Sequence, residues 1–400
     1  MAGSSAAFRP LRGVRVLDFS STLAGPFAGM ILAQLGADVV KIEALQGDDS
    51  RKWAPAVADG SVTYAHVNAG KRGIALDLSK PAALQVALDL AARSDVLLQS
   101  MRPGVAERIG IGEAALRSRN PDILYYSLNG YGSGPMGNSL PGYDPLVQAS
   151  SGIMLMNGYD DMPLVRCAPS VVDLATGQWI AIAVMGAVLA RRDGQTIRSI
   201  ETALIDSAFS MVPYQATTAR MTGKRPKKSG SGNPMVSPNQ AYKARDASIM
   251  ITALNQRLWD RTATALGAPE LVDDARFRTV ANRTENSAIL ERVIEDILAQ
   301  EDADVWVERF LAAGVPVARV SGLEEAARSE MAAERQTFSE LDGLPLVRLP
   351  WLIDGAPLPW TRPAPHLGEH TAELLRELGY DEAGIAELEN SGAVALYNPA

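Results

Sequence analysis

The sequence predicts an α/β fold: a mostly parallel sheet covered by helices on both faces, together with a smaller α+β unit in the centre of the chain. Two observations lead to this fold class. Over about the first two hundred residues, short apolar and β-branched runs alternate with helical patterns. Near residue 222 the alternation stops at a segment rich in Gly, Pro, Ser and cations, and a different pattern comes after it.

The alternating elements begin at the first strand. Apolar and β-branched runs predict strands over residues 14–19 and 37–43, and the Ala-, Leu- and Met-rich stretch between them predicts a helix over 25–35. Further strands of the same sheet are expected at residues 74–78, 95–98 and 123–128. The helix expected after the strand at 74–78 has Pro81 in its first turn, where proline is well tolerated. Such strand–helix–strand units favour parallel pairing, since the helix returns the chain to the same end of the sheet.

The most apolar stretch of the chain covers residues 179–189. It is shorter than the roughly 20 residues that cross a bilayer, so it predicts a buried core helix. The start of the chain has no apolar run of signal-peptide length, and its last residues match no targeting signal. We therefore expect no association with a membrane.

The centre of the chain has a different character. Residues 222–239 have almost no apolar periodicity, which is typical of a loop or linker. The elements expected after it are strands joined by a turn over 242–253, helices near 256–266, 286–300 and 302–313, and a last helix over 371–379. Proline is frequent from residue 343 to residue 365, so we expect no regular structure there.

The composition narrows the class of function. With 47% hydrophobic and 21% charged residues, the chain is predicted to be compact rather than disordered. Its net charge of -8 argues against a nucleic-acid partner, which needs a basic face. The single cysteine, Cys167, forms no disulfide within the chain, which favours a reducing compartment such as the cytoplasm. Small-molecule chemistry is the class that these observations favour.

Residues typical of redox, metal and thiol catalysis are scarce. The first turn, residues 20–26, lacks the G-x-G-x-x-G pattern that lets a backbone approach a pyrophosphate, which argues against an NAD site. His366 and His370 have a helix-face spacing, but Gly368 lies between them and no third ligand is evident, so we expect no metal site. Cys167 has neither a CxxC partner nor a nearby His to form its thiolate.

Asp173 is the only charged residue between Arg166 and Arg191. Two interpretations are open. Asp is a preferred N-cap, and this one lies where the long apolar helix begins. A carboxylate among apolar neighbours also has the chemistry of a covalent nucleophile. The pattern of residues does not decide between the two.

Cations lie at the ends of two predicted strands. Lys71 precedes the strand at 74–78, and Arg102 and Arg108 come after the strand at 95–98. Ligands of open α/β sheets bind near the carboxyl ends of strands, and Arg suits phosphate. These residues therefore predict a phosphate-bearing ligand near Arg102, with exposed solubilising charge as the alternative.

Six segments resemble, in order, those of the class III coenzyme A transferases of the CaiB/BaiF type, the family of formyl-CoA transferase and of the carnitine and bile-acid CoA transferases. They run from residue 11 to residue 379 and include PSVVDLATG around Asp173 and SDVLLQSMRPGVAERIGIG around Arg102. The resemblance implies an interlocked homodimer. Its large Rossmann-like α/β domain is expected to comprise residues 1–224 and 331–400, and its small α+β domain residues 225–330.

The resemblance also implies an activity and the residues that perform it. Asp173 lies at the position of the aspartate that attacks an acyl-CoA thioester, forms an acyl anhydride and then an aspartyl-CoA thioester, and passes CoA to an acceptor carboxylate. No permanent cofactor or metal is implied. The positions that the family uses around CoA are Ser21, Thr22, Leu23, Ala24, Lys71, Ser100, Met101, Arg102 and Arg108. Gly230, Gly232 and Asn233 resemble a glycine loop that covers the aspartate, and a flexible linker is the alternative for this segment.

The chain departs from its relatives near the expected acyl site. Members that act on oxalate carry His and Gln where this chain has Ser21 and Leu23, and the usual Asn is Ser100 here, so we expect a larger or less polar acid. Related 2-methylacyl-CoA racemases place a catalytic His at Tyr143, and a phenol with a pKa of about 10 is a poor replacement. Transferase is therefore favoured over racemase. Transfer of CoA between two carboxyls of one molecule and a non-catalytic CoA- or NAD-binding protein remain alternatives.

Overall fold

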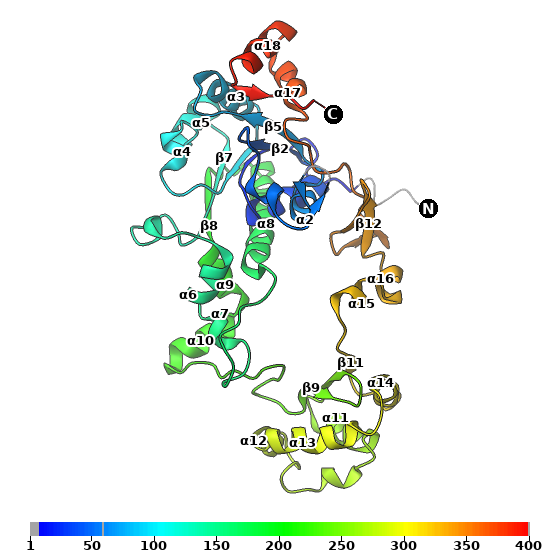
Figure 1. The fold of residues 1–400 in the computed structure, drawn as a ribbon. Coiled ribbons are helices and arrows are strands. Elements are labelled where there is room, and N and C mark those ends of the chain that lie inside the picture. The colour runs from blue at the N-terminus through cyan, green and yellow to red at the C-terminus, as the bar shows by residue number, and fades with distance from the viewer. Residues whose placement is uncertain (1–7, 58–59, 399–400) are drawn as a thin grey trace. The chain divides into compact units, whose positions relative to one another are not determined.

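The computed structural model describes residues 8–57 and 60–398, which form two compact units (Figure 1). The first unit contains the described residues up to Ser151, then Cys167–Ala216, and those from Ala333 onward. The second contains Gly152–Arg166 and Thr217–Ala332. The first unit is therefore built from segments that are far apart in the sequence.

A seven-stranded sheet forms the centre of the first unit, in the order β16-β5-β2-β1-β6-β7-β8. Its strands are β1 (Arg15–Phe19), β2 (Asp38–Glu43), β5 (Arg72–Leu76), β6 (Val96–Gln99), β7 (Leu124–Asn129), β8 (Ser199–Ala203) and β16 (Val394–Ala395). All neighbouring strands are parallel except β16, which pairs antiparallel with β5. The predicted mostly parallel sheet is confirmed. Strand β5 ends earlier than expected because Asp77 accepts hydrogen bonds from the backbone N–H and the hydroxyl of Ser79, which turns the chain.

Helices cover both faces of this sheet (Figure 1). The layer drawn above it contains α3 (Pro81–Ala92), α5 (Glu113–Arg119), α17 (Thr371–Leu378) and α18 (Glu382–Asn390). The other layer contains α1 (Ala24–Gln34), α2 (Val62–Asn68) and α8 (Val171–Arg192). Leu17 and Phe19 of β1 belong to the apolar core beneath the first layer. Because side chains alternate along a strand, Asp18 points to the opposite face, where it lies against Gly29 of α1.

Helices α1 and α8 approach each other closely. A Cβ atom added at Gly177 of α8 would lie 2.7 Å from the carbonyl oxygen of Ala24 and 2.8 Å from the ring of Phe27. The buried-core prediction for α8 is correct for one face only, because Trp179, Ile182 and Leu189 are 46%, 51% and 60% exposed. Among the described helices, only α8 is long and apolar enough to span a membrane. Core helices of soluble proteins have the same length and composition.

The second unit is a small α+β structure. Its antiparallel sheet contains β9 (Asn239–Lys243), β10 (Ser248–Thr252) and β11 (Val317–Arg319), in the order β11-β10-β9. The helices α11 (Gln256–Ala265), α13 (Ser287–Leu298) and α14 (Ala303–Ala312) pack on a core that includes Trp259, Phe277 and Trp306. The three helices and strand β10 lie where the apolar patterns predicted them, whereas β9 begins three residues before the predicted segment and β11 was not predicted.

The prediction of irregular structure over residues 343–365 is wrong for its first part and correct for residues 358–365. Two hairpins reach into the segment: β12 (Phe338–Leu341) with β13 (Leu344–Val347), and β14 (Leu352–Ile353) with β15 (Ala356–Pro357). Their turns are Asp342-Gly343 and Asp354-Gly355, and all four residues have positive φ angles of 50–83°. Asp-Gly favours a two-residue hairpin turn, so the signal was present in the sequence.

The remaining elements are short. In the first unit they are η2 (Asp49–Lys52), β3 (Ala56–Val57), β4 (Gly60–Ser61), α4 (Val105–Arg108), η3 (Gly137–Ser139), α6 (Asp144–Ser150) and α9 (Leu204–Met211). The second unit has α7 (Ile153–Met156), η4 (Pro269–Val272), α12 (Val280–Glu285) and α15 (Leu323–Ala327). Helices α10 (Pro213–Thr222) and α16 (Glu330–Glu334) lie at boundaries between the units.

Candidate active site

A cavity of about 160 Å³ in the first unit brings together most of the predicted site residues. Those that line it are Ser21, Thr22, Leu23, Ala24, Ser100, Met101, Arg102, Tyr143 and Asp173. The turn with Ser21 comes after β1, and the segment with Ser100 comes after β6, which is its parallel neighbour. The cavity therefore lies at the carboxyl ends of parallel strands, where open α/β sheets bind ligands. We call it the Asp173 cavity.

Asp173 lies in the first turn of α8 and is partly buried. Burial, and secondly the negative charge of Asp144, raise the pKa of Asp173 to about 7. Its carboxylate accepts no hydrogen bond from any residue that the structure describes. An unpaired and partly desolvated carboxylate is a stronger nucleophile than one stabilised by donors, because its charge is less dispersed.

The N-cap interpretation of Asp173 is wrong, because another carboxylate caps α8. Asp144 Oδ2 accepts hydrogen bonds from the backbone N–H groups of Val172, at 2.8 Å, and Asp173, at 3.3 Å. Asp144 is 1% exposed, and its Oδ1 accepts from Gln148 Nε2 at 2.7 Å. The role of Asp144 is not recognisable from the sequence, since the residues that it caps lie 28 and 29 positions further along the chain.

The structure places the predicted cations in different environments. Arg102 and Arg108 are exposed, and their side chains form no hydrogen bond or ion pair with the described residues. Arg102 lines the Asp173 cavity, and Arg108 ends the short helix α4 that comes after it. Both guanidinium groups are therefore available to an anionic ligand.

Lys71 differs from the expectation that it contacts CoA. Its side chain is fully buried, and its Nζ donates to Asp18 Oδ2 at 2.7 Å, Pro26 O at 2.8 Å and Asn68 Oδ1 at 2.8 Å. Burial lowers the pKa of Lys71 to about 8. All three donor positions of the ammonium are used inside the protein, so Lys71 supports the turn after β1 rather than lining the Asp173 cavity.

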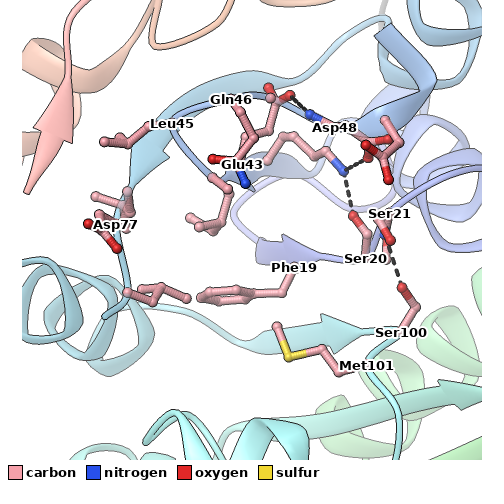
Figure 2. Close-up of a pocket in the computed structure, with 17 residues that line it drawn as sticks. Phe19, Ser20, Ser21, Glu43, Leu45, Gln46, Asp48, Asp77, Ser100 and Met101 are labelled. Atoms are coloured by element: carbon pink, nitrogen blue, oxygen red, sulfur yellow. Dashed lines mark hydrogen bonds and ion pairs between the residues drawn. The ribbon is translucent and has the colours of Figure 1, made fainter. Parts of the chain in front are cut away.

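A second cavity of about 500 Å³ adjoins the first (Figure 2). It shares Ser21, Ser100 and Met101 with the Asp173 cavity. The rest of its wall combines apolar side chains with carboxylate and amide groups from β1, β2, β5 and the loops after them, among them Phe19, Glu43, Leu45, Gln46 and Asp77. We call it the 500 Å³ cavity. The two cavities therefore lie next to each other at the carboxyl ends of the parallel strands.

The predicted glycine loop belongs to the second unit. Gly230 has a φ angle of 57°, and its backbone N–H donates to Gly158 O at 3.0 Å. A Cβ atom there would lie 2.0 Å from the ring of Tyr159. The backbone N–H of Asn233 donates to Asn239 O at 3.1 Å, and Gly232 N donates to Ser229 O at 2.7 Å. The segment is thus held by specific contacts within its own unit, which differs from a featureless linker.

Comparison with known proteins identifies similar chains. Residues 11–371 match CoA-transferase family III. The chain is 33% identical to an acetyl-CoA:oxalate CoA-transferase of Acetobacter aceti, over 94% of this chain and 97% of that one. It is 32% identical to a succinyl-CoA:glutarate CoA-transferase of Mus musculus, over 97% and 91%. Among solved structures, a CaiB/BaiF family protein from Brucella suis matches with a TM-score of 0.83 and 29% identity, over 92% and 99%.

Proposed function

The chain belongs to CoA-transferase family III, and we propose that it moves CoA from an acyl-CoA thioester to a carboxylic acid through covalent intermediates on Asp173. The observation that carries this proposal is the unpaired carboxylate of Asp173 in a cavity at the carboxyl ends of parallel strands. A nucleophile must approach the carbonyl carbon without first losing strong hydrogen bonds, and this carboxylate has none to lose among the described residues.

The proposed reaction consists of four exchanges that balance without an oxidant or a metal. A carboxylate oxygen of Asp173 attacks the acyl carbon of the donor thioester, the C–S bond breaks, and an aspartyl acyl anhydride and CoA thiolate result. The thiolate attacks the aspartyl carbonyl and releases the donor acid, which leaves an aspartyl-CoA thioester. The acceptor carboxylate displaces the thiolate to form a second anhydride. The thiolate then attacks the acceptor carbonyl and restores the Asp173 carboxylate.

The joined cavities support a binding mode for CoA. We place the nucleotide in the 500 Å³ cavity, where Gln46 and Asp77 offer hydrogen-bonding groups beside apolar walls. The thioester end then passes Ser21 and Ser100, which line both cavities, to reach Asp173. Arg102 and Arg108, with no partners among the described residues, are the groups that we assign to the phosphates. The carboxylates around the 500 Å³ cavity argue against phosphates there.

The racemase alternative has less support. Moving a proton between two faces of a substrate needs two bases. Tyr143, at the position of the expected His, is 57% exposed, and Asp173 is the one carboxylate among the residues that line its cavity. One carboxylate with a pKa raised to about 7 suits covalent transfer better than exchange on two faces.

Mass spectrometry tests the proposal directly. The enzyme is incubated with acetyl-CoA or succinyl-CoA, and the peptide with Asp173 is examined for an added acyl or CoA group. A coupled assay then measures transfer to a panel of mono- and dicarboxylic acids. Asp173→Ala is expected to form no adduct and to lose at least about a thousandfold in kcat. Full activity of that variant refutes the covalent role of Asp173, and solvent deuterium entering the α position without any acceptor acid indicates racemase activity.

A further inference from the structure

We propose that Lys41 and Asp48 are positioning residues of this transferase, which hold the Ser20–Thr22 turn in the conformation that the reaction needs. The turn comes directly after β1 and forms part of the wall of both cavities. The inference rests on the proposed function, because the turn acts on transfer through the residues that face Asp173.

The turn has a conformation that its sequence does not favour. Thr22 has a φ angle of 76°, in the left-handed region, although threonine is β-branched and has no preference for it. Such a residue persists only where its surroundings fix it, and strained residues of this kind concentrate at functional sites. Groups outside the turn must therefore hold Thr22 in place.

Hydrogen bonds to three consecutive residues hold the backbone of the turn, and Figure 2 shows those of Ser20 and Ser21. Lys41 Nζ donates to the carbonyl oxygen of Ser20. Asp48 accepts from the backbone N–H of Thr22 at 3.2 and 3.3 Å. Between them, the N–H of Ser21 donates to Ser100 Oγ at 3.0 Å. Lys41 and Asp48 are themselves joined at 2.9 Å, so a single ion pair fixes both ends of the turn.

This ion pair is buried. The side chains of Lys41 and Asp48 are 1% and 2% exposed. Burial favours the neutral acid, but the ammonium of Lys41 outweighs it and holds the pKa of Asp48 at about 2. Asp48 also accepts from the N–H and hydroxyl of Ser50, at 2.9 and 2.8 Å, which fixes the carboxylate from the other side. The pair is therefore rigid and charged throughout the physiological pH range.

A second ion pair, between Asp18 and Lys71, supports the turn through Ser20. Asp18 accepts from the backbone N–H of Ser20 at 3.0 Å and from its hydroxyl, and it pairs with Lys71 at 2.7 Å. Gly25 leaves room for this packing, since a Cβ atom there would lie 2.2 Å from that of Ser20. With Lys41 and Asp48, the two ammonium groups and two carboxylates balance one another in the protein interior.

The turn matters for transfer because it leads directly into the wall of the active site. Thr22, Leu23 and Ala24 line the Asp173 cavity together with the carboxylate that we assign as nucleophile. A displacement of about 1 Å at such a wall reduces catalysis by about a hundredfold. Lys41 and Asp48 also line the 500 Å³ cavity. Their side chains are only 1% and 2% exposed, and the Lys41 ammonium is held by Ser20 and Asp48. The loss of Lys41 is therefore expected to lower kcat rather than to raise the KM for acyl-CoA.

A purely structural ion pair makes a different prediction. Removing one partner of a buried pair leaves an unpaired charge and destabilises the protein, whereas replacing both by apolar residues often restores stability. If the pair only stabilises the fold, activity returns together with stability in the double replacement. If the pair positions the turn, stability returns and activity does not, because Ser20 O and Thr22 N still lack their partners.

The experiment compares Lys41→Met, Asp48→Leu and the double variant, with unfolding temperature, kcat and the KM for acyl-CoA as readouts. The matched control is Arg72→Met on the neighbouring strand, whose buried guanidinium binds Asp38 at 2.6 Å and contacts neither cavity. The double variant is expected to unfold nearer the wild-type temperature than either single variant, yet to keep a kcat about a hundredfold low with KM within about threefold. The control is expected to lose stability only.

Two kinetic outcomes overturn the inference: wild-type kcat in the stable double variant, or a raised KM with unchanged kcat, which indicates direct contact with CoA. Adding Thr22→Gly to the double variant is expected to recover about tenfold in kcat, since glycine adopts a positive φ without support.

Hydrogen exchange of residues 20–24 reports on the turn whether or not Asp173 is the nucleophile. Unchanged exchange in the double variant refutes the inference, whereas absence of an Asp173 adduct in the wild type refutes only the proposed function.

Discussion

The chemistry of this protein depends on two carboxylates that have different tasks at neighbouring positions. Asp144 is buried and uses both oxygens, on the first N–H groups of α8 and on Gln148. Asp173 accepts no hydrogen bond from the described residues, and its charge is disfavoured by burial and by Asp144. One carboxylate thus places the helix that carries the other, and at the same time raises the pKa of its neighbour.

The rate of transfer is expected to depend on pH through Asp173. Because only the ionised carboxylate attacks, and its pKa is about 7, kcat/KM for acyl-CoA should fall about tenfold per pH unit below pH 7. Asp144→Asn removes the like charge and should shift this acid limb to lower pH. The measurement is a pH–rate profile from pH 5 to pH 9 for both proteins, with circular dichroism to check the fold. A flat profile in the wild type contradicts the assignment.

The same pKa has a consequence for stability. The folded-state pKa of Asp173, about 7, exceeds its ordinary value of 3.8, so the folded protein binds the proton more tightly than the unfolded chain. Stability therefore falls as pH rises from about 4 to about 7, by at most about 4 kcal/mol. Asp173→Asn should raise the unfolding temperature at pH 8 and have little effect at pH 4. An equal effect at both pH values contradicts the expected ionisation.

Part of this site could be predicted from residue types alone. The isolation of Asp173 among apolar residues and the position of Arg102 after a strand were visible in the sequence. Asp144, Lys41 and Asp48 were not, because their roles depend on contacts with residues that are distant along the chain or on a neighbouring loop. Lys71 could be located but not interpreted, since no pattern distinguishes an ammonium that binds a ligand from one that is buried on Asp18.

At the scale of elements, the site depends on the contact between α1 and α8. The cavity wall at Leu23 and Ala24 belongs to the start of α1, and Asp173 belongs to the start of α8. Gly177 allows the two helices to approach, because a larger residue would meet the backbone of Ala24 at 2.7 Å. The spacing of these helices therefore sets the width of the cavity beside the nucleophile.

Two glycines of α8 give a matched test of this spacing. Gly177→Ala is expected to cost about 1–3 kcal/mol of stability, since the helices must move apart, and to lower kcat. Gly186 lies in the same helix and has no atom within 4 Å of an added Cβ. Gly186→Ala should stabilise the helix by about 0.5–1 kcal/mol. Because Gly186 lies on the exposed face with Ile182 and Leu189, the kcat values of the two variants are compared at equal oligomeric state, where that of Gly186→Ala should be unchanged. Thermal unfolding and steady-state kinetics measure both, and equal behaviour of the two variants contradicts the role of the contact.

Elements were predictable where one local pattern decided them. Five strands of the large sheet are rich in apolar residues and lie within two residues of the predicted positions: β1, β2, β5, β6 and β7. The more exposed parallel strand β8 was not predicted. Helix α18 and strand β16 were missed, because α18 has few apolar residues and β16 has only two residues that pair with β5. The two hairpins form despite the frequent prolines, because each Asp-Gly turn adopts the positive φ angles of a two-residue hairpin loop.

At the scale of the whole molecule, helix α8 exposes apolar side chains on one face. Trp179, Ile182 and Leu189 are about half exposed in the single chain. Large exposed apolar patches mark interaction surfaces. We propose that a second copy of the chain covers this face, in keeping with the homodimer that the family resemblance implies.

The mass in solution tests this proposal. Size-exclusion chromatography with light scattering is expected to give twice the 42.6 kDa of one chain. Leu189→Glu should shift the protein toward the single-chain mass, because an ionised carboxylate in an apolar interface is unfavourable. The control is Lys227→Glu, a charge reversal at an exposed residue. Arg72→Glu is unsuitable, because it breaks ion pairs within the chain. A wild-type protein that elutes as a single chain at micromolar concentration contradicts the dimer.

The antiparallel pairing of β16 with β5 affects how the protein is made. The second unit, Gly152–Arg166 and Thr217–Ala332, is synthesised completely before the segment that completes the sheet edge. Strand β5 therefore lacks its partner β16 until the end of synthesis. The large sheet closes only when α17, α18 and β16 emerge. Nascent chains of this enzyme are thus exposed to edge-to-edge aggregation for most of translation, and chaperone capture during that interval is expected to govern the yield of active protein.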